Sequence, residues 1–193
     1  AVPNVKLLKQ PNVEMAVARN AGAHYATSDY IVFLDANDEW LPFFTFELQR
    51  LITRYPLHVA FATRYQFIDA NKVPIDAKIK LNNCNPDGVD MHDYFDIAAK
   101  GDLPFNLSSF LVKRSFFATF GGFAERNTAK DAQNLYAKTA KAKGIAYSPN
   151  IHVHIHTNEK SKKTIAKKLS VAPFSRRFYQ KSLAGYKSLL PID

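Results

Sequence analysis

The stretch ARNAGAHYATSDYIVFLDANDEW, residues 18–40, places an uninterrupted apolar run directly before a cluster of acids. The run Tyr30–Leu34 has the pattern of a strand that is buried on both faces, as in the sheets of α/β proteins. Carboxylates at the end of a buried strand are costly to desolvate unless something pairs with them. Asp35, Asp38 and Glu39 therefore need a metal ion, a cationic partner or solvent, and the residues alone leave all three open.

The composition is that of a single globular domain. The chain has 193 residues, of which 47% are hydrophobic and 13% aromatic, enough for a sizeable core. Cys84 is the only cysteine, which excludes an internal disulfide and suits a reducing compartment. No apolar run approaches the ~20 residues that span a bilayer, and the first residues lack the apolar region of a signal peptide. We expect a cytoplasmic location.

The positive charge is concentrated at the C-terminal end. Residues 159–193 carry nine Lys and Arg against two acids, so that +7 of the net charge of +9 lies there and the rest of the chain is close to neutral. This distribution argues against a nucleic-acid groove across the whole fold and indicates a localised anion-binding or membrane-facing element. We expect no nucleic-acid partner, and a basic nucleic-acid-binding protein remains a minor alternative that only the charge favours.

Strand-like and helix-like segments alternate along the chain, which predicts an α/β architecture. The expected strands are 5–8, 30–34, 59–68, 107–112 and 145–155, with a hairpin turn at Ala70-Asn71. The expected helices are 14–26, 42–54, 91–99, a helix from Arg114 that stops at Gly121-Gly122, and 128–143. Pro42 is expected at the first helical position and Asp90 as a helix cap.

Four motifs occur in a fixed order: ARNAG at 18–22, YIVFLDANDEWLP at 30–42, FGGF at 120–123, and an acid in the helix before GIAYSP at 144–149. In these motifs the chain resembles the family 2 glycosyltransferases with the GT-A fold, over about Gln10 to Pro149. The resemblance implies a Rossmann-like mixed sheet flanked by helices. It also implies an inverting enzyme of polysaccharide biosynthesis, which moves a sugar from a nucleotide-sugar donor to a glycan or lipid-linked acceptor. The expected donor is a UDP-sugar.

The resemblance also implies roles for individual residues. Arg19 and Asn20 match the family's Ala-Arg-Asn-x-Gly helix and, with Asp35, are expected to contact the nucleotide sugar. Asp35 and Asp38, with Asn37 as a further oxygen ligand, are expected to hold a divalent metal, Mn or Mg, which neutralises the donor diphosphate. The simpler alternative for the acids is a solvated turn before the next helix, and for Arg19 an exposed helix position.

Asp131 matches the second acid of the family's Glu-Asp pair, the general base that takes the proton from the acceptor hydroxyl. Two residues depart from the family pattern. Asn37 stands where the metal-binding acid usually falls, so metal binding is expected to be weaker or to depend on Asp38. Lys130 replaces the Glu beside Asp131, and a neighbouring cation makes a weaker base. The family often has an arginine about two turns later in this helix. In this chain Lys138 is the cation nearest to that position, slightly out of register.

These departures keep a second function open, a non-catalytic GT-A-like module that binds a nucleotide or sugar. His152, His154 and His156 recur with period two and so share one face of the last strand. They are either extra metal ligands or part of an exposed strand face.

We expect two regions in the chain. Residues 1–158 would be a GT-A-like domain that lacks the family's first strands, and its unpaired sheet edge would invite a homodimer. Residues 159–193 would be a basic helical extension, in which Tyr179, Leu183, Tyr186 and Leu190 form one apolar stripe among cations. Such a stripe has two possible roles. It either holds the enzyme at the anionic inner (cytoplasmic) face of the membrane or docks on the protein's own sheet.

Overall fold

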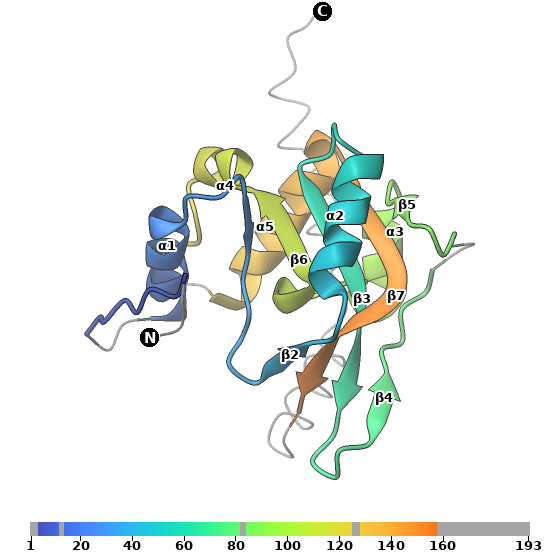
Figure 1. Ribbon diagram of the computed structural model, residues 1–193. Helices are drawn as coiled ribbons and strands as arrows, with labels where there is room; N and C mark the ends of the chain where they lie inside the picture. The colour runs from blue at the N-terminus through green and yellow to red at the C-terminus, as the bar shows by residue number, and fades with distance from the viewer. Residues whose placement is uncertain (1–3, 12–13, 82–83, 125–127, 158–193) are drawn as a thin grey trace, which may run out of the picture.

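The structure is a computed structural model in which residues 4–11, 14–81, 84–124 and 128–157 are described. Seven strands form one mixed sheet (Figure 1). They are β1 (Tyr30–Val32), β2 (Asp38–Trp40), β3 (Ala60–Ile68), β4 (Pro74–Asp76), β5 (Val89–Asp90), β6 (Phe110–Lys113) and β7 (Ile145–His156). The main path through the sheet is β1-β6-β3-β7-β2, while β4 pairs with β3 and β5 pairs with β7.

Strand direction decides which chain ends meet at the edge of the sheet. β3 and β7 are parallel, whereas β6 is antiparallel to both β1 and β3. Because β6 runs against β1, with Val32 opposite Leu111, the residues just before β6 lie beside the carboxyl end of β1. Ligands of open α/β sheets bind beyond the carboxyl ends of strands.

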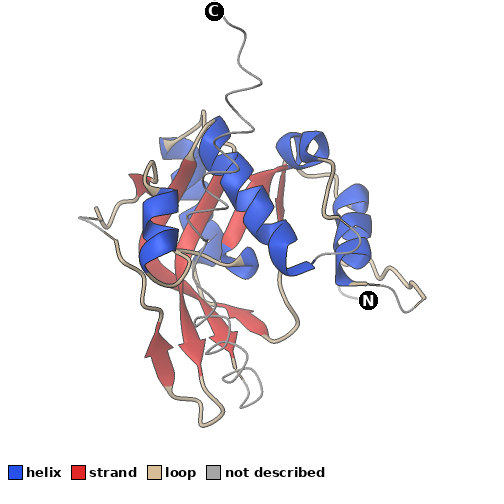
Figure 2. Cartoon of the chain, turned by 180° about the vertical axis from the view of Figure 1, so that it is seen from behind, coloured by secondary structure: helices blue, strands red, loops and turns tan. Residues whose placement is uncertain are grey.

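Helices cover both faces of the sheet, which confirms the expected α/β class with a GT-A-like mixed sheet. They are α1 (Met15–Tyr25), α2 (Phe44–Arg54), α3 (Tyr94–Lys100), the 3₁₀ turn η1 (Leu107–Ser109), α4 (Arg114–Phe120) and α5 (Thr128–Ala142). In Figure 1, α2 lies in front of β3 and β7 and α5 lies behind the sheet, and Figure 2 shows the opposite side. No helix among the described residues is long and apolar enough to cross a membrane.

The core behind the sheet is rich in aromatic rings. Phe105 and Phe110 stack with their centroids 5.2 Å apart, and both rings meet Tyr136 of α5 edge-on at 4.9 and 4.8 Å. Tyr94 of α3 stacks on Phe105 at 5.5 Å. These side chains are at most 2% exposed. Pairs of this geometry add to the free energy of burial, and they hold the segment from Phe105 to Phe110 rigidly beneath the end of β1.

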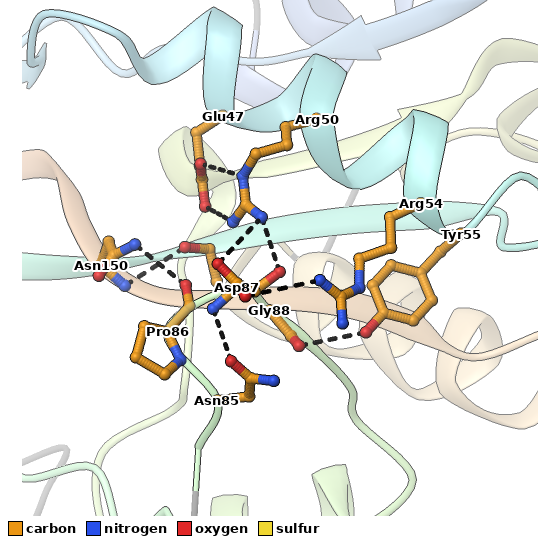
Figure 3. Close-up of polar contacts among 10 residues, drawn as sticks. Glu47, Arg50, Arg54, Tyr55, Asn85, Pro86, Asp87, Gly88 and Asn150 are labelled. Atoms are coloured by element: carbon orange, nitrogen blue, oxygen red, sulfur yellow. Dashed lines mark hydrogen bonds and ion pairs between the residues drawn. The ribbon is translucent and has the colours of Figure 1, made fainter.

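A polar network fastens α2 to the turn at 85–88 (Figure 3). Glu47 is only 6% exposed and accepts two hydrogen bonds from the guanidinium of Arg50, at 2.9 Å and 2.7 Å. A further nitrogen of Arg50 donates to the carbonyl of Asp87 at 2.8 Å. Asn150 of β7 donates to the carbonyl of Pro86 at 3.2 Å. The arginine guanidinium holds the pKa of Glu47 below its usual value, although burial opposes this shift.

Several predicted elements are confirmed. α1 and α5 lie within two residues of the expected bounds, and β3 turns back into β4 through a turn in which the Asp69 carboxylate accepts the Asn71 N–H. α4 ends at Phe120, before Gly121, whose φ of 86° is the left-handed conformation that glycine favours. β7 runs from Ile145 to His156 as expected, one residue further at its end.

Other expectations are wrong, one because the element does not form and two because one end of the element lies elsewhere. Residues 5–8 form no strand, and Val5 and Leu7 are 68% and 80% exposed. The strand expected at 30–34 ends at Val32, because the backbone N–H of Asp35 bonds to a side chain instead of a neighbouring strand. The following helix begins at Phe44 instead of Pro42, since Phe43 takes a left-handed conformation with φ of 70°.

Two further corrections concern the segment from 90 to 113. Asp90 is part of β5 and does not cap a helix; the Met91 N–H donates to the carbonyl of Ile145, so α3 begins only at Tyr94. The strand expected at 107–112 runs from Phe110 to Lys113. Residues 107–109 form η1 instead, because Asn106 and Ser109 bond to each other's backbone as a reciprocal cap.

Candidate functional site

The acid at the end of β1 has a cationic partner. Asp35 follows β1, and its Oδ1 accepts a hydrogen bond of 2.5 Å from Nη2 of Arg19 on α1. The arginine side chain is 15% exposed and the aspartate side chain 46% exposed, so the arginine is largely covered and the carboxylate is open to solvent. The guanidinium also lies over the ring of Phe123, 6.0 Å from its centroid. Of the three partners considered for the acids, a metal ion, a cation or solvent, Asp35 has a cation, the guanidinium of Arg19.

Asp38 is held differently, by neutral hydrogen-bond donors. Its backbone N–H donates to the carbonyl of Asp35, which closes the turn between the two acids. Its Oδ2 accepts hydrogen bonds from the Ser108 hydroxyl at 2.5 Å and from the Asn106 amide at 3.4 Å. Burial raises the pKa of Asp38 above its ordinary value and the charge of Asp35 adds to the rise, whereas the bonds from Ser108 and Asn106 oppose it.

Two motifs that are distant in the sequence meet at Phe123. The side-chain amide of Asn20 donates to the Phe123 carbonyl and accepts its N–H, both at 2.8 Å. The Phe123 ring packs against Phe33 at 5.3 Å and Phe117 at 5.2 Å. Both the nitrogen and the oxygen of the Asn20 side-chain amide are thus bonded to the backbone that follows Gly121-Gly122. Its expected contact with a nucleotide stays a prediction.

A wide cleft of about 1460 Å³ opens beside these residues, between α1 and the chain from β1 to Asn37. Arg19 and Asp35 line it, and Asn37 lies at its edge with an exposed side chain. Apolar side chains of α1 and β1 form much of the remaining wall, among them Met15 and Ile31. The cleft combines apolar surface with a few convergent charged groups, as small-molecule sites do.

The histidines of β7 lie next to acids. Nδ1 of His154 and Nε2 of His156 lie 3.7 and 3.4 Å from Oε2 of Glu39 on the neighbouring strand β2. Burial lowers the pKa of His152, although the nearby Glu47 opposes the shift. Among the described residues, no group of three or more His, Cys, Asp or Glu side chains is placed to hold a metal ion. The histidine face therefore shows no ready-made metal site.

The expected general base lies in α5. Asp131 is in the first turn of this helix, but its side chain and that of Lys130 lie outside what the structure describes. Lys138, two turns along, places its ammonium over the ring of Phe120, 4.7 Å from the centroid. The basic extension expected at 159–193 also lies outside the described residues.

Sequence reasoning missed three residues of the site. Ser108 and Asn106 bind Asp38. Phe123 contacts Arg19 and Asn20 of α1 and so joins this helix to the glycine turn, Gly121-Gly122. A signal for the first two existed in Asn-Leu-Ser-Ser, a capping pattern before an apolar run. Placing them beside Asp38 required the direction of β6, which the sequence pattern does not show.

The sequence is similar to a family model and to a curated protein. The family model described as Glycosyl transferase family 2 matches residues 1–98, which contain Arg19, Asp35 and Asp38. The uncharacterized glycosyltransferase YibD of Escherichia coli (strain K12) is 50% identical over 40 residues. That alignment covers 21% of this chain and 12% of YibD, so the similarity concerns a small part of the relative's length.

Proposed function

Since the chain belongs to glycosyl transferase family 2, we propose that it transfers a sugar from a nucleotide-sugar donor, with Arg19, Asp35 and Asp38 at the donor site. One observation carries the proposal: Asp35 and Asp38 lie in one turn after β1, where Asp35 pairs with Arg19 of α1 on the wall of the large cleft and Asp38 accepts a hydrogen bond from Ser108. This is where open α/β sheets bind their ligands.

The diphosphate and the ribose of the donor need different partners, and the pair Arg19–Asp35 offers one for each. A diphosphate is an anion that arginine binds through its planar guanidinium, and Arg19 is held at this position by Asp35 and the Phe123 ring. A ribose hydroxyl is a hydrogen-bond donor that a carboxylate accepts. Because Arg19 takes only Oδ1 of Asp35, the second carboxylate oxygen is left to accept such a hydroxyl.

The donor set of this turn fits a divalent cation of the Mg²⁺ or Mn²⁺ type. Such ions prefer oxygen ligands and are often bound by one or two carboxylates together with substrate phosphates, without a cage made of protein alone. Asp35, Asp38 and the amide oxygen of Asn37 offer that set, and Ser108 and Asn106 engage only Oδ2 of Asp38. When bound, the cation would neutralise the diphosphate as it leaves.

We assign the proton transfer to Asp131. The acceptor hydroxyl attacks the anomeric carbon from the face opposite the diphosphate; the new bond to the sugar forms as the bond to the diphosphate breaks, which inverts the configuration. The Asp131 carboxylate takes the hydroxyl proton, as a positioned general base does. Its place in the first turn of α5, after the glycine turn that Asn20 and Phe123 hold, supports this assignment.

The other partners expected from the sequence belong to the same proposal. The acceptor would be a glycan or lipid-linked sugar of a polysaccharide pathway, reached from the cytoplasm. β1 has a strand neighbour on one side only among the described residues, which supports proposing a homodimer through its other edge. Asn37 and Lys130 favour the second function, a binding module that holds a nucleotide sugar without transferring it.

Calorimetric titration with UDP, GDP and single-stranded RNA, each with and without Mn²⁺, tests the donor site. We expect UDP to bind, Mn²⁺ to strengthen it, and RNA not to bind. Binding of RNA but of neither nucleotide would overturn the proposal. Release of UDP from UDP-hexoses in the presence of an acceptor then separates the enzyme from a binding module, because a module binds the donor and releases nothing.

A further inference from the structure

Ser108 connects Asp35 and Asp38, the two acids of the turn at residues 35–38, which we call the donor turn. Its side chain is fully buried. Its hydroxyl donates to Oδ2 of Asp38 at 2.5 Å and accepts the backbone N–H of Asp35 at 3.1 Å. Its carbonyl accepts the indole N–H of Trp40 at 2.8 Å. One serine thus contacts Asp35, three residues after β1, and both ends of β2.

The directions of these hydrogen bonds are fixed by chemistry. A backbone N–H can only donate, so the hydroxyl oxygen of Ser108 is the acceptor for Asp35. A hydroxyl has one proton, and here it points to the Asp38 carboxylate, which accepts it. Hydrogen bonds in such a chain strengthen one another in a poorly solvated place. These hydrogen bonds hold Oδ2 of Asp38, and neither Ser108 nor Asn106 engages Oδ1.

The neighbours of Ser108 make its position rigid. The reciprocal cap between Asn106 and Ser109 closes η1 around it. Trp40, whose indole bonds to its carbonyl, packs on Phe44 at the start of α2, with ring centroids 5.0 Å apart. A hydroxyl on such a support orients a ligand-binding carboxylate better than a mobile one would.

We propose that Ser108 is a positioning residue for donor binding, which acts by holding the Asp38 carboxylate in the orientation that receives the donor diphosphate and its cation. The proposal rests on the proposed function of Asp38. It adds that a residue 70 positions away in the sequence, which does not itself contact the donor, sets how well that carboxylate binds.

A double-mutant cycle tests this role. UDP is titrated calorimetrically in the presence of Mn²⁺ into the wild type, Ser108→Ala, Asp38→Ala and the double variant, at a temperature well below the melting midpoint of each. A hydrogen bond to a charged group corresponds to roughly tenfold in affinity, so Ser108→Ala should weaken UDP binding by about that factor. In the Asp38→Ala background the same change should alter the affinity by less than about twofold, because interacting residues are not additive.

Ser109→Ala is the matched control. Ser109 is equally buried and its hydroxyl bonds within η1, to Asn106, but not to Asp38. We expect it to lower the melting temperature and to leave the affinity for UDP with Mn²⁺ unchanged. If both serine variants weaken binding alike, the effect belongs to the folding of η1 and the proposal is wrong.

The remaining outcomes distinguish a failure of the positioning role of Ser108 from a failure of the donor role of Asp38. An unchanged affinity in Ser108→Ala, or an equal loss in both backgrounds, contradicts the positioning role while Asp38 keeps its place in the donor site. An unchanged affinity in Asp38→Ala contradicts the proposed donor role of Asp38 and the positioning role together.

Discussion

Asn20 on α1 and Phe123 after the glycine turn are joined by two reciprocal hydrogen bonds of 2.8 Å, across 103 positions of sequence. A side-chain amide that pairs with both backbone groups of one residue replaces a strand partner at that point. The same Phe123 ring lies beneath the guanidinium of Arg19. Two motifs of the sequence are therefore two halves of one support, which places the arginine beside Asp35.

The glycine turn provides a test of this support in Gly122→Ala. Gly122 has a φ of 74°, and a Cβ there would lie 2.7 Å from the Asn20 oxygen that accepts the Phe123 N–H. We expect this variant to lose roughly 2–4 kcal/mol of unfolding free energy, from backbone strain and from the disturbed hydrogen bond. Urea unfolding followed by circular dichroism measures it.

Gly121→Ala is the control for that change. Gly121 also has a positive φ, of 86°, but a Cβ there would meet nothing within 4 Å. The expected loss is about 1 kcal/mol, from the left-handed backbone alone. Equal losses in the two variants would show that the contact with Asn20 contributes nothing to stability.

The network on α2 predicts a large difference between two arginines of one helix. Arg50→Ala leaves the buried Glu47 without the partner that bonds to both its oxygens, and should cost about 2–3 kcal/mol of unfolding free energy, less than for a fully buried pair because Arg50 is 30% exposed. Arg54→Ala removes an exposed contact of 3.9 Å to Asp87 and the position of the guanidinium 5.8 Å from the centroid of the Tyr55 ring, and should change stability by less than about 1 kcal/mol. Thermal melts at pH 7 compare them.

The same network predicts a pH dependence. Arg50 holds the pKa of Glu47 below its value of 4.5 in an unfolded chain. A group whose pKa is lower in the folded state stabilises the fold above the unfolded pKa, and this contribution fades as the pH falls through the folded pKa. The stability difference between wild type and Arg50→Ala should therefore be full at neutral pH and shrink below about pH 4.5. A difference that stays constant down to pH 3 would speak against the role of Glu47.

Asp131→Asn tests the proposed base. A positioned general base contributes about 100-fold or more to the rate, so transfer in the intact enzyme should fall by at least that factor. Affinity for the donor should stay nearly unchanged, since asparagine keeps the size of the side chain. Full transfer activity in the variant would remove the assignment.

The sequence predicted the elements of this fold better than their ends. The apolar run after Asp29, the helix before Gly121 and the long last strand carried clear periodicity or stop signals, and each formed. The start of α2 was misplaced by two residues, because Phe43 takes a left-handed conformation that its residue type does not favour. Such a position is decided by tertiary packing.

The site was predicted as a set of acids but not as a set of contacts. Asp35 and Asp38 could be chosen because they follow a predicted strand, and Arg19 because it matches a motif of the family that the sequence resembles. Their partners Ser108 and Phe123 come from segments 70 or more positions away. The antiparallel direction of β6 brings Ser108 to this edge, and direction leaves no trace in a local pattern. For that reason the sequence left open whether the acids face a metal, a cation or solvent.

The dependence of UDP affinity on Mn²⁺ tests most directly whether Asp35 and Asp38 hold the donor and its cation together. It is measured by calorimetry in the wild type, Asp35→Ala, Asp38→Ala and the control Asp29→Ala. Asp29 is an exposed acid just before β1 and outside the donor turn. We expect Mn²⁺ to raise UDP affinity about tenfold or more in the wild type and in Asp29→Ala, and this dependence to disappear when Asp38 is removed and to weaken when Asp35 is removed. Metal dependence that survives in both Asp35→Ala and Asp38→Ala would show that the cation binds elsewhere, with the histidines of β7 as the next candidates.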